Sequence, residues 1–187
     1  VKSLSGGWRD WAGHCAWERV PGALLVREPE TGPETRREAL QLCRIRDERL
    51  VSDRQGIVWN FPASRKGIVK LVCRIDGAGF RLTLADHWMN PCDETGPGLS
   101  PVSLPVTAAE TGSTKWVEVT AHWDLDAGTA TFACDGRIFA TRPLASSPRF
   151  GLSYLHLQTL AETTDPKGTF FRSFTKVNES LTKATEQ

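Results

Sequence analysis

The amino-acid sequence predicts an all-β chain that folds as an antiparallel two-sheet β-sandwich. Short apolar segments recur along the whole chain, separated by clusters of Gly, Pro, Asp and Ser. Several of these segments alternate apolar and polar side chains, as a strand with one buried face does. No long stretch keeps the period of an amphipathic helix.

The strand signal is strongest where the alternation is clearest. In the segment 116–123, Val117, Val119, Ala121 and Trp123 alternate with more polar residues, and the segments 68–75 and 80–84 behave in the same way. The full set of predicted strands is 23–27, 39–45, 57–61, 68–75, 80–85, 102–106, 116–123, 129–134, 137–141, 152–159 and 169–175.

The turn residues fit this set of strands. Asp76-Gly77 and Asp135-Gly136 are the Asp-Gly pairs that tight type I′ hairpins favour, and residues 124–128 form a slightly longer hairpin loop. Together they predict an antiparallel meander in the second half of the chain. Residues 28–38 are expected to form an exposed loop, and 90–101, rich in Pro and Gly, a long functional loop.

A chain of 187 residues fits one domain. We expect a single domain over 1–187, with 1–20 as an N-terminal extension or edge strand and 179–187 as a polar tail. The chain begins with Val1 and has no initiator Met, so we expect one module of a longer polypeptide. No apolar run reaches the about 18–20 residues that span a membrane, so we expect no membrane partner.

Charge and cysteine content restrict the function classes. Lys and Arg number 23 and Asp and Glu 22, so no basic excess exists to hold nucleic acid. The cysteines lack the paired spacing of a zinc site. Their odd number leaves at least one thiol free or paired between chains, and two intrachain disulfides would need a secreted protein. The location is open, with a secreted or extracytoplasmic one slightly favoured. The cysteines are Cys15, Cys43, Cys73, Cys92 and Cys134.

Three segments carry a resemblance to a known family. They are 79–91 (GFRLTLADHWMNP), 123–128 followed by Asp135-Gly136-Arg137, and 151–158 (GLSYLHLQ) followed by Ala161-Glu162. Together they resemble a concanavalin A-like jelly roll of the kind attached to glycan-processing proteins such as sialidase-like enzymes. The resemblance covers about half of the chain and leaves out residues 1–54.

The resemblance implies a jelly-roll sandwich that contacts an oligosaccharide or glycan without catalysing a reaction, next to another domain of the parent polypeptide. One alternative is a polysaccharide lyase or glycoside hydrolase with its active site on the concave sheet. A second is a structural or assembly domain that braces a neighbour, for which the N-terminal Trp8, Trp11 and Trp17 would offer a docking surface.

The first set of candidate ligand-binding residues is Tyr154, His156 and Gln158. They are two residues apart on a predicted strand, so they project from one face. Their groups would hydrogen-bond sugar hydroxyls, or Tyr154 and His156 would act in a β-elimination in which a base removes the C5 proton of a uronate. The alternative is a half-buried strand whose polar groups satisfy neighbouring side chains.

The second set surrounds Trp88, whose ring is suited to stack on a sugar while its neighbours bind hydroxyls. The alternative is a strand end at which Asp86 caps a turn and Trp88 plugs the edge of the sandwich. The residues of this set are Arg81, His87, Trp88, Asn90 and Asp93.

The known enzymes of this fold carry signatures that the chain lacks. Alginate lyases use Gln-x-His, whereas this chain has His156-x-Gln158, and retaining glucanases use Glu-x-Asp-x-Glu. No catalytic residue is therefore assigned. Calcium is the one metal considered, through Asp93, Asp124, Asp126 and Asp135, but Asp-x-Asp is also ordinary turn chemistry, so no metal site or cofactor is predicted.

Overall fold

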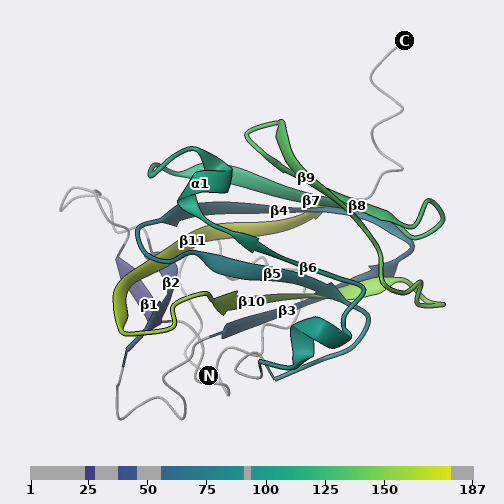
Figure 1. The fold of residues 1–187 in the computed structure, drawn as a ribbon, viewed down its shortest axis with the longest axis horizontal. Helices are drawn as coiled ribbons and strands as arrows, with labels where there is room; N and C mark the ends of the chain where they lie inside the picture. Colours follow the sequence, from purple (N-terminus) through teal and green to yellow (C-terminus); the bar gives the residue numbers. More distant parts are fainter. Residues whose placement is uncertain (1–23, 28–37, 46–55, 91–93, 178–187) are drawn as a thin grey trace.

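The computed structural model describes residues 24–27, 38–45, 56–90 and 94–177, and these form two antiparallel sheets packed face to face (Figure 1). The four-stranded sheet has the order β3 (Gly56–Ser64), β10 (Leu152–Thr159), β5 (Phe80–Ala85) and β6 (Val102–Val106). The seven-stranded sheet has the order β1 (Leu24–Arg27), β2 (Glu38–Arg44), β11 (Asp165–Val177), β4 (Lys66–Ile75), β7 (Val117–Asp124), β8 (Thr129–Cys134) and β9 (Arg137–Pro143).

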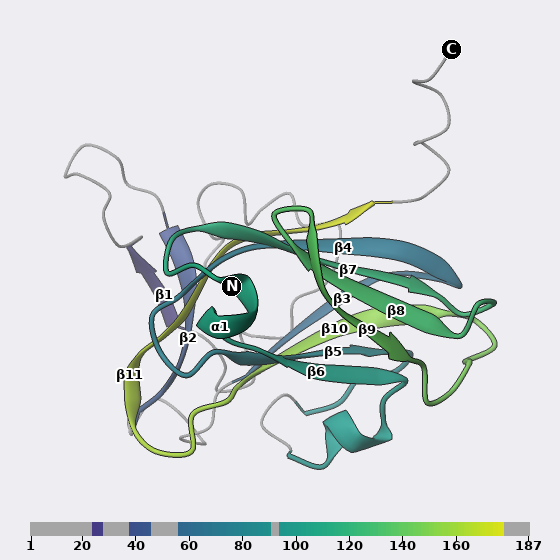
Figure 2. The ribbon, with the colours of Figure 1, turned by 45° about the horizontal axis from the view of Figure 1, so that its top comes forward.

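The described residues contain little helix. A 3-10 turn, η2 (Gly96–Leu99), lies in the β5–β6 connection. A single helical turn, α1 (Ala108–Thr111), links β6 of one sheet to β7 of the other (Figure 2). Its Thr107–Glu110 capping box satisfies the first backbone N–H groups, which explains why so short a helix forms. No helix here is long and apolar enough to span a bilayer.

The predicted all-β, two-sheet fold is confirmed, and each predicted strand overlaps an observed one. In β7 the burial alternates residue by residue, as the sequence pattern predicts. Several boundaries differ: β3 continues to Ser64 and β9 to Pro143, and the largest difference is at the start of β11. Strand β11 begins at Asp165, upstream of the predicted 169, because its register against β2 shifts between Asp165 and Thr169, where Gly168 adopts a φ of 59°. The sequence Asp-Pro-Lys-Gly therefore resembles a turn although it lies within an irregular strand.

One predicted hairpin is wrong. Asp76-Gly77 joins β4 to β5, and these strands belong to different sheets. The backbone N–H groups of Asp76 and Gly77 both donate to the carbonyl oxygen of Gly168, so the turn crosses over the end of the sandwich. Asp135-Gly136 does connect the paired strands β8 and β9, with φ values of 46° and 80°. The predicted meander therefore holds for β7, β8 and β9 and ends there.

The core lies between the two sheets. Leu155 of β10 pairs with Trp59 of β3 and Leu84 of β5, and all three side chains are buried in one cluster. Aromatic rings join the layers: Phe80 of the four-stranded sheet meets Phe171 of the other edge to face, with ring centroids 5.1 Å apart. The residues between the core positions of β10, including His156, therefore turn away from the core.

Candidate functional site

The face of the four-stranded sheet that is turned away from the core carries a set of polar side chains from adjacent strands. Strand β10 lies between β3 and β5, so its outward residues each have two cross-strand neighbours. Tyr154 pairs with Asn60 and Ala85, His156 with Val58 and Thr83, and Gln158 with Gly56 and Arg81. The structure thus brings Arg81, Tyr154, His156 and Gln158 of the predicted set onto one face.

This polar face is mostly covered. His156 is 3% exposed and Gln158 is 6% exposed, whereas Tyr154 and Arg81 are half-buried. A ligand therefore reaches Tyr154 and Arg81 before the other two. The Tyr154 and His156 rings lie 6.1 Å apart between centroids.

The His156 ring has a defined protonation state. Its Nε2 lies 3.3 Å from the carbonyl oxygen of His87, and because a carbonyl only accepts, Nε2 carries the hydrogen. Nδ1 is then the bare nitrogen, and it is buried without a hydrogen-bond partner. Burial lowers the pKa of His156 from 6.5 to about 4, so the imidazole is neutral near pH 7.

The segment Asp86–Asn90 leaves the end of β5 and contacts this face. Its contacts are the His87 carbonyl on His156 and the Asp86 carbonyl, which accepts a 3.4 Å hydrogen bond from the Ser153 hydroxyl. The Asp86 carboxylate lies 2.8 Å from Nδ1 of the His87 ring. Trp88 is 50% exposed, so it does not plug the edge of the sandwich.

Of the remaining members of the Trp88 set, one lies in the described structure and one does not. Asn90 is exposed on the same segment, and Asp93 lies outside the described residues. Sequence reasoning missed further polar groups: Thr83 and Ser103 hydrogen-bond each other at 2.8 Å on the same face, and Asn60 donates to the carbonyl of Ser153 at 3.0 Å. The period-two alternation of the 80–85 and 102–106 segments was the signal that could have placed Thr83 and Ser103 there.

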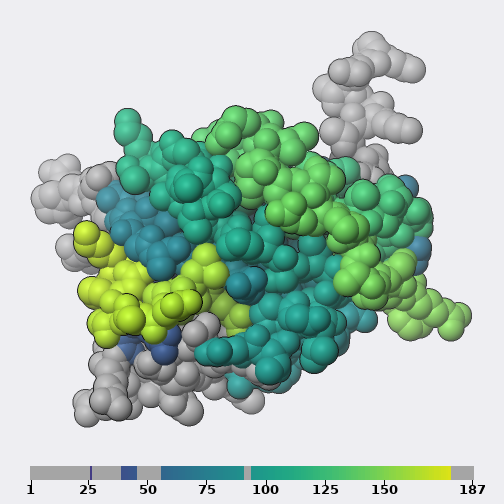
Figure 3. Space-filling view, viewed as in Figure 1, coloured from purple at the N-terminus to yellow at the C-terminus, as the bar shows by residue number. Residues whose placement is uncertain are grey.

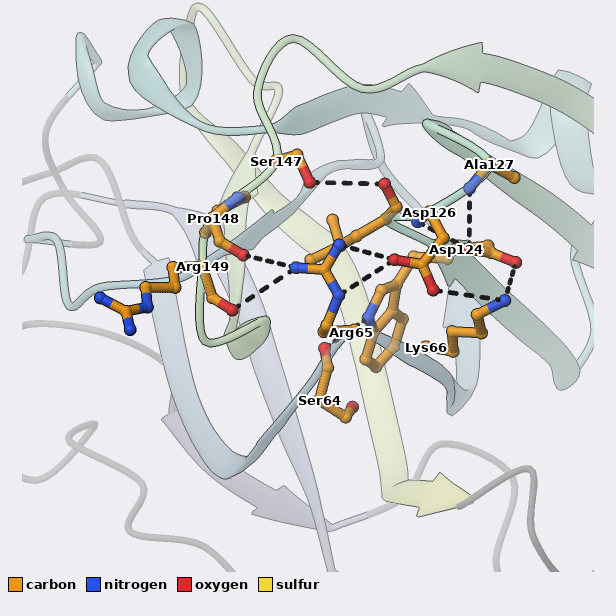
Figure 4. Close-up of polar contacts among 11 residues, drawn as sticks. Ser64, Arg65, Lys66, Asp124, Asp126, Ala127, Ser147, Pro148 and Arg149 are labelled. Carbon is orange, nitrogen blue, oxygen red and sulfur yellow. Dashed lines mark hydrogen bonds and ion pairs between the residues drawn. The ribbon is translucent and has the colours of Figure 1, made fainter.

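A second polar cluster ties three loops together at one end of the sandwich (Figure 4). Arg65, in the β3–β4 turn, donates from Nε and Nη2 to Oδ1 of Asp126 at 3.0 and 2.6 Å. Its Nη1 reaches the carbonyls of Pro148 and Arg149 at 3.5 and 3.4 Å. The β9–β10 connection held in this way projects from the molecule (Figure 3) and carries Phe150, which is 78% exposed.

Of the aspartates considered for calcium, Asp93 lies outside the described residues, and Asp124 and Asp135 hold turns. Asp124 accepts the backbone N–H groups of Asp126 and Ala127, and Lys66 Nζ lies 2.8 Å from its other oxygen. The hydrogen bond from Lys66 lowers the pKa of Asp124 to about 2. Asp135 accepts the N–H of Glu118 at 2.8 Å. Within the described residues, no three His, Cys, Asp or Glu side chains gather as metal ligands.

The chemistry available on the polar face is that of hydrogen bonding. The polar outward positions described on its strands hold hydroxyl, amide, imidazole and guanidinium groups, and none is a carboxylate. Glycoside hydrolysis by the usual route needs two carboxyl groups flanking the scissile bond. The described positions on this face therefore offer hydrogen-bonding groups, and no pair of carboxyl groups is found among them.

Neither a protein-family model nor a curated protein sequence matches the chain. Among solved structures it is similar to a sialidase, with 12% identity and a TM-score of 0.51 over 83% of this chain and 17% of that one. It is also similar to a tetrameric galectin from the sponge Cinachyrella sp. (9% identity, TM-score 0.46, 66% of this chain and 99% of that one). A family 16 endo-glucanase from Bacteroides ovatus gives 10% identity and a TM-score of 0.49 over 83% of this chain and 85% of that one.

At such identities the likeness concerns the fold alone. The chain spans 17% of the length of the sialidase that it matches. Together with the observed strand order, the likeness to the sialidase chain, which has a TM-score of 0.51, supports a two-sheet jelly-roll sandwich. The fold that the sequence resemblance implied is thereby confirmed.

Proposed function

We propose that this jelly roll is a non-catalytic module that contacts carbohydrate through the Asp86–Asn90 segment and the adjoining polar face. The observation that carries the proposal is Trp88, a large aromatic side chain that is 50% exposed beside a face of hydrogen-bonding groups. A half-exposed indole presents a flat apolar face, and stacking on the apolar face of a pyranose is one use of such a face.

The neighbours of Trp88 suit a ligand rich in hydroxyl groups. His87 and Asn90 are exposed on the same segment, and Tyr154 and Arg81 are the accessible members of the polar face. His87, Asn90 and Tyr154 both donate and accept hydrogen bonds, as a sugar hydroxyl does, and the Arg81 guanidinium donates them. The similarity to a sialidase over only 17% of that protein's length supports an accessory module of a larger glycan-processing protein.

The binding experiment compares two exposed apolar residues. Glycan-array screening followed by calorimetric titration is expected to find an oligosaccharide ligand, and Trp88→Ala is expected to weaken its binding at least about tenfold. Ile138→Ala is the matched control, since Ile138 is 64% exposed but lies on β9 of the other sheet. Absence of any glycan ligand, or full binding by the Trp88→Ala protein, would contradict the proposal and favour a structural or assembly role.

A lyase is the second candidate, and one observation favours it. Tyr154 and the neutral imidazole of His156 lie side by side on one face, with ring centroids 6.1 Å apart, and this is the pair that proton abstraction from a uronate would use. Turnover of uronate polysaccharides is followed through the ultraviolet absorbance of the unsaturated product. Activity that survives in both His156→Ala and Tyr154→Phe proteins would eliminate this candidate.

A further inference from the structure

His156 is held between the sheet and the segment that carries Trp88. It lies on β10, the strand between β3 and β5, and its ring reaches out of the sheet to the His87 backbone, one residue before Trp88. The contact uses Nε2–H, and the opposite nitrogen, Nδ1, is buried with no donor or acceptor. One side of this imidazole is therefore a fixed contact, and the other is an unsatisfied buried atom.

We propose that His156 is a positioning residue that ties the Asp86–Asn90 segment, and with it Trp88, to the four-stranded sheet, and that acid loosens this tie. The inference rests on the proposed function, because it describes how presentation of Trp88 to a glycan is regulated. It adds that the module holds Trp88 in place at neutral pH and releases it as the pH falls toward 5.

Acid is expected to favour the open arrangement because of the position at which the His156 imidazole would bind a second proton. In the closed arrangement Nε2 already carries a hydrogen, so the added proton must sit on Nδ1, which is buried and lacks an acceptor. This is why burial lowers the pKa of His156 to about 4. When the segment lifts away, water reaches the ring and its pKa returns toward 6.5. Protons therefore bind the open arrangement better and shift the population toward it.

The size of the effect follows from these two pKa values. The proton-binding factor of a group is one plus the ratio of its protonated to its neutral form. The ratio of open to closed protein is proportional to this factor for a pKa of 6.5, divided by the same factor for a pKa of about 4. Between pH 7.4 and pH 5.5 this quotient rises about tenfold. Above pH 7.4 it is almost constant.

The effect of His156 on the pH dependence has to be distinguished from that of the other charged and polar groups around it. Strand β3 presents only the uncharged Val58 and Asn60 at the neighbouring positions. Strand β5 contributes the cation of Arg81, one pair along from Thr83, and β6 contributes Ser103 through Thr83. Among the described residues, the other side chains near the ring are Tyr154 and the uncharged Gln158 on β10 itself, and Asp86 and His87 on the segment, whose side chains contact each other.

A buried thiol next to His156 measures the opening directly. Thr83 pairs with His156 on the same face and is 1% exposed, so Thr83→Cys places a thiol that a reagent meets only when the face opens. The reagent is 4,4′-dithiodipyridine, which reacts with thiols in acid, and mass mapping resolves each cysteine. The labelling rate of the full chain is divided by the rate of the urea-unfolded chain at the same pH. Cys73, fully buried in the core, reports global unfolding in the same sample.

We expect this ratio at the introduced thiol to rise about tenfold from pH 7.4 to pH 5.5, well ahead of labelling at Cys73. Adding His156→Gln, which keeps an N–H donor but does not titrate, should leave the ratio unchanged with pH. His87→Asn keeps the backbone carbonyl that His156 contacts, so the rise of the ratio with falling pH should persist in it. An equal rise in the His156→Gln protein, no rise in the parent, or labelling only in step with Cys73 would overturn the inference.

A measurement on the unmodified protein tests the inference even where a substituted protein fails to fold. Titration of the His156 ring by NMR in the unmodified protein should give a pKa near 4, and an ordinary value of 6.5 would also overturn the inference. The labelling result does not depend on any glycan. A failure to bind glycans would therefore refute the proposed function while leaving the acid-sensitive contact intact.

Discussion

Gly67 and Trp123 test the packing that sets the register of the seven-stranded sheet. They pair directly across β4 and β7, and the Trp123 side chain is fully buried with its Nε1 donating to the Ser64 carbonyl at 3.0 Å. A Cβ on Gly67 would lie 2.6 Å from Cζ2 and 2.7 Å from Cη2 of the indole. Gly67 does not have a positive φ, so the need for glycine here comes from volume: that of the indole first, and then that of the Ser64 hydroxyl, whose Oγ lies 3.1 Å from the same Cβ.

The magnitude follows from which atoms collide. Gly67→Ala should lower the free energy of unfolding by about 1–3 kcal/mol, the usual cost of overpacking a core. Trp123→Phe should cost about 2–4 kcal/mol through a lost hydrogen bond and a new cavity. Cζ2 and Cη2 are distal indole atoms that a phenylalanine ring does not reach, so Trp123→Phe removes the two closest contacts of the alanine methyl and leaves that with Ser64 Oγ at 3.1 Å. In the Trp123→Phe background, Gly67→Ala should be neutral or stabilising by about 0.5 kcal/mol.

The assay is a double-mutant cycle by urea unfolding, followed by far-ultraviolet circular dichroism because tryptophan is removed. The expected coupling between the two substitutions is about 1–3 kcal/mol in favour of the double variant. Gly98→Ala is the control, since its Cβ would meet no atom within 4 Å. Additive effects, or a neutral Gly67→Ala in the parent protein, would show that the indole does not occupy this position.

Three further outcomes are expected. Asp165→Ala should cost about 1–3 kcal/mol in urea unfolding, because its carboxylate accepts three backbone N–H groups; an unchanged midpoint would contradict this. Burial raises the pKa of the Cys73 thiol, so brief mass-mapped labelling should modify it only in urea. Contact with Lys66 lowers the pKa of Asp124 from 3.8 to about 2, so its stabilisation is present above pH 3.8 and lost toward pH 2. In the Asp124→Ala protein, the urea midpoint of unfolding should therefore fall less between pH 3.8 and pH 2 than it does in the parent protein.

The local features of the fold could be predicted because they depend on neighbours in sequence. Alternation in β7 reports one buried face, and Asp135-Gly136 adopts the positive φ values that a tight hairpin needs. Asp76-Gly77 has the same composition but joins two different sheets. What decides between the two is the carbonyl of Gly168, far along the chain, which binds both N–H groups of the turn. No local pattern contains that information.

The candidate site divides in the same way. The period of a strand places Tyr154, His156 and Gln158 on one face from sequence alone, and the register bears this out. Their unequal exposure could not be predicted, since it depends on long-range contacts such as that between the Asp86–Asn90 segment and His156. The roles of Arg65 and Asp126 were also hidden, because one cation joins loops that are distant in sequence.

Strand β10 shows where the sequence departs from what folding alone requires. Leu155 and Leu157 fill the core, whereas His156 buries a polar ring on the other face and leaves Nδ1 unsatisfied. An unsatisfied buried nitrogen costs about 1–3 kcal/mol, a cost that an apolar side chain at this position would avoid. Such departures from the most stable choice are expected at functional positions. Because the same ring contacts the segment that carries the half-exposed Trp88, the cost falls where the proposed contact with carbohydrate requires an adjustable surface.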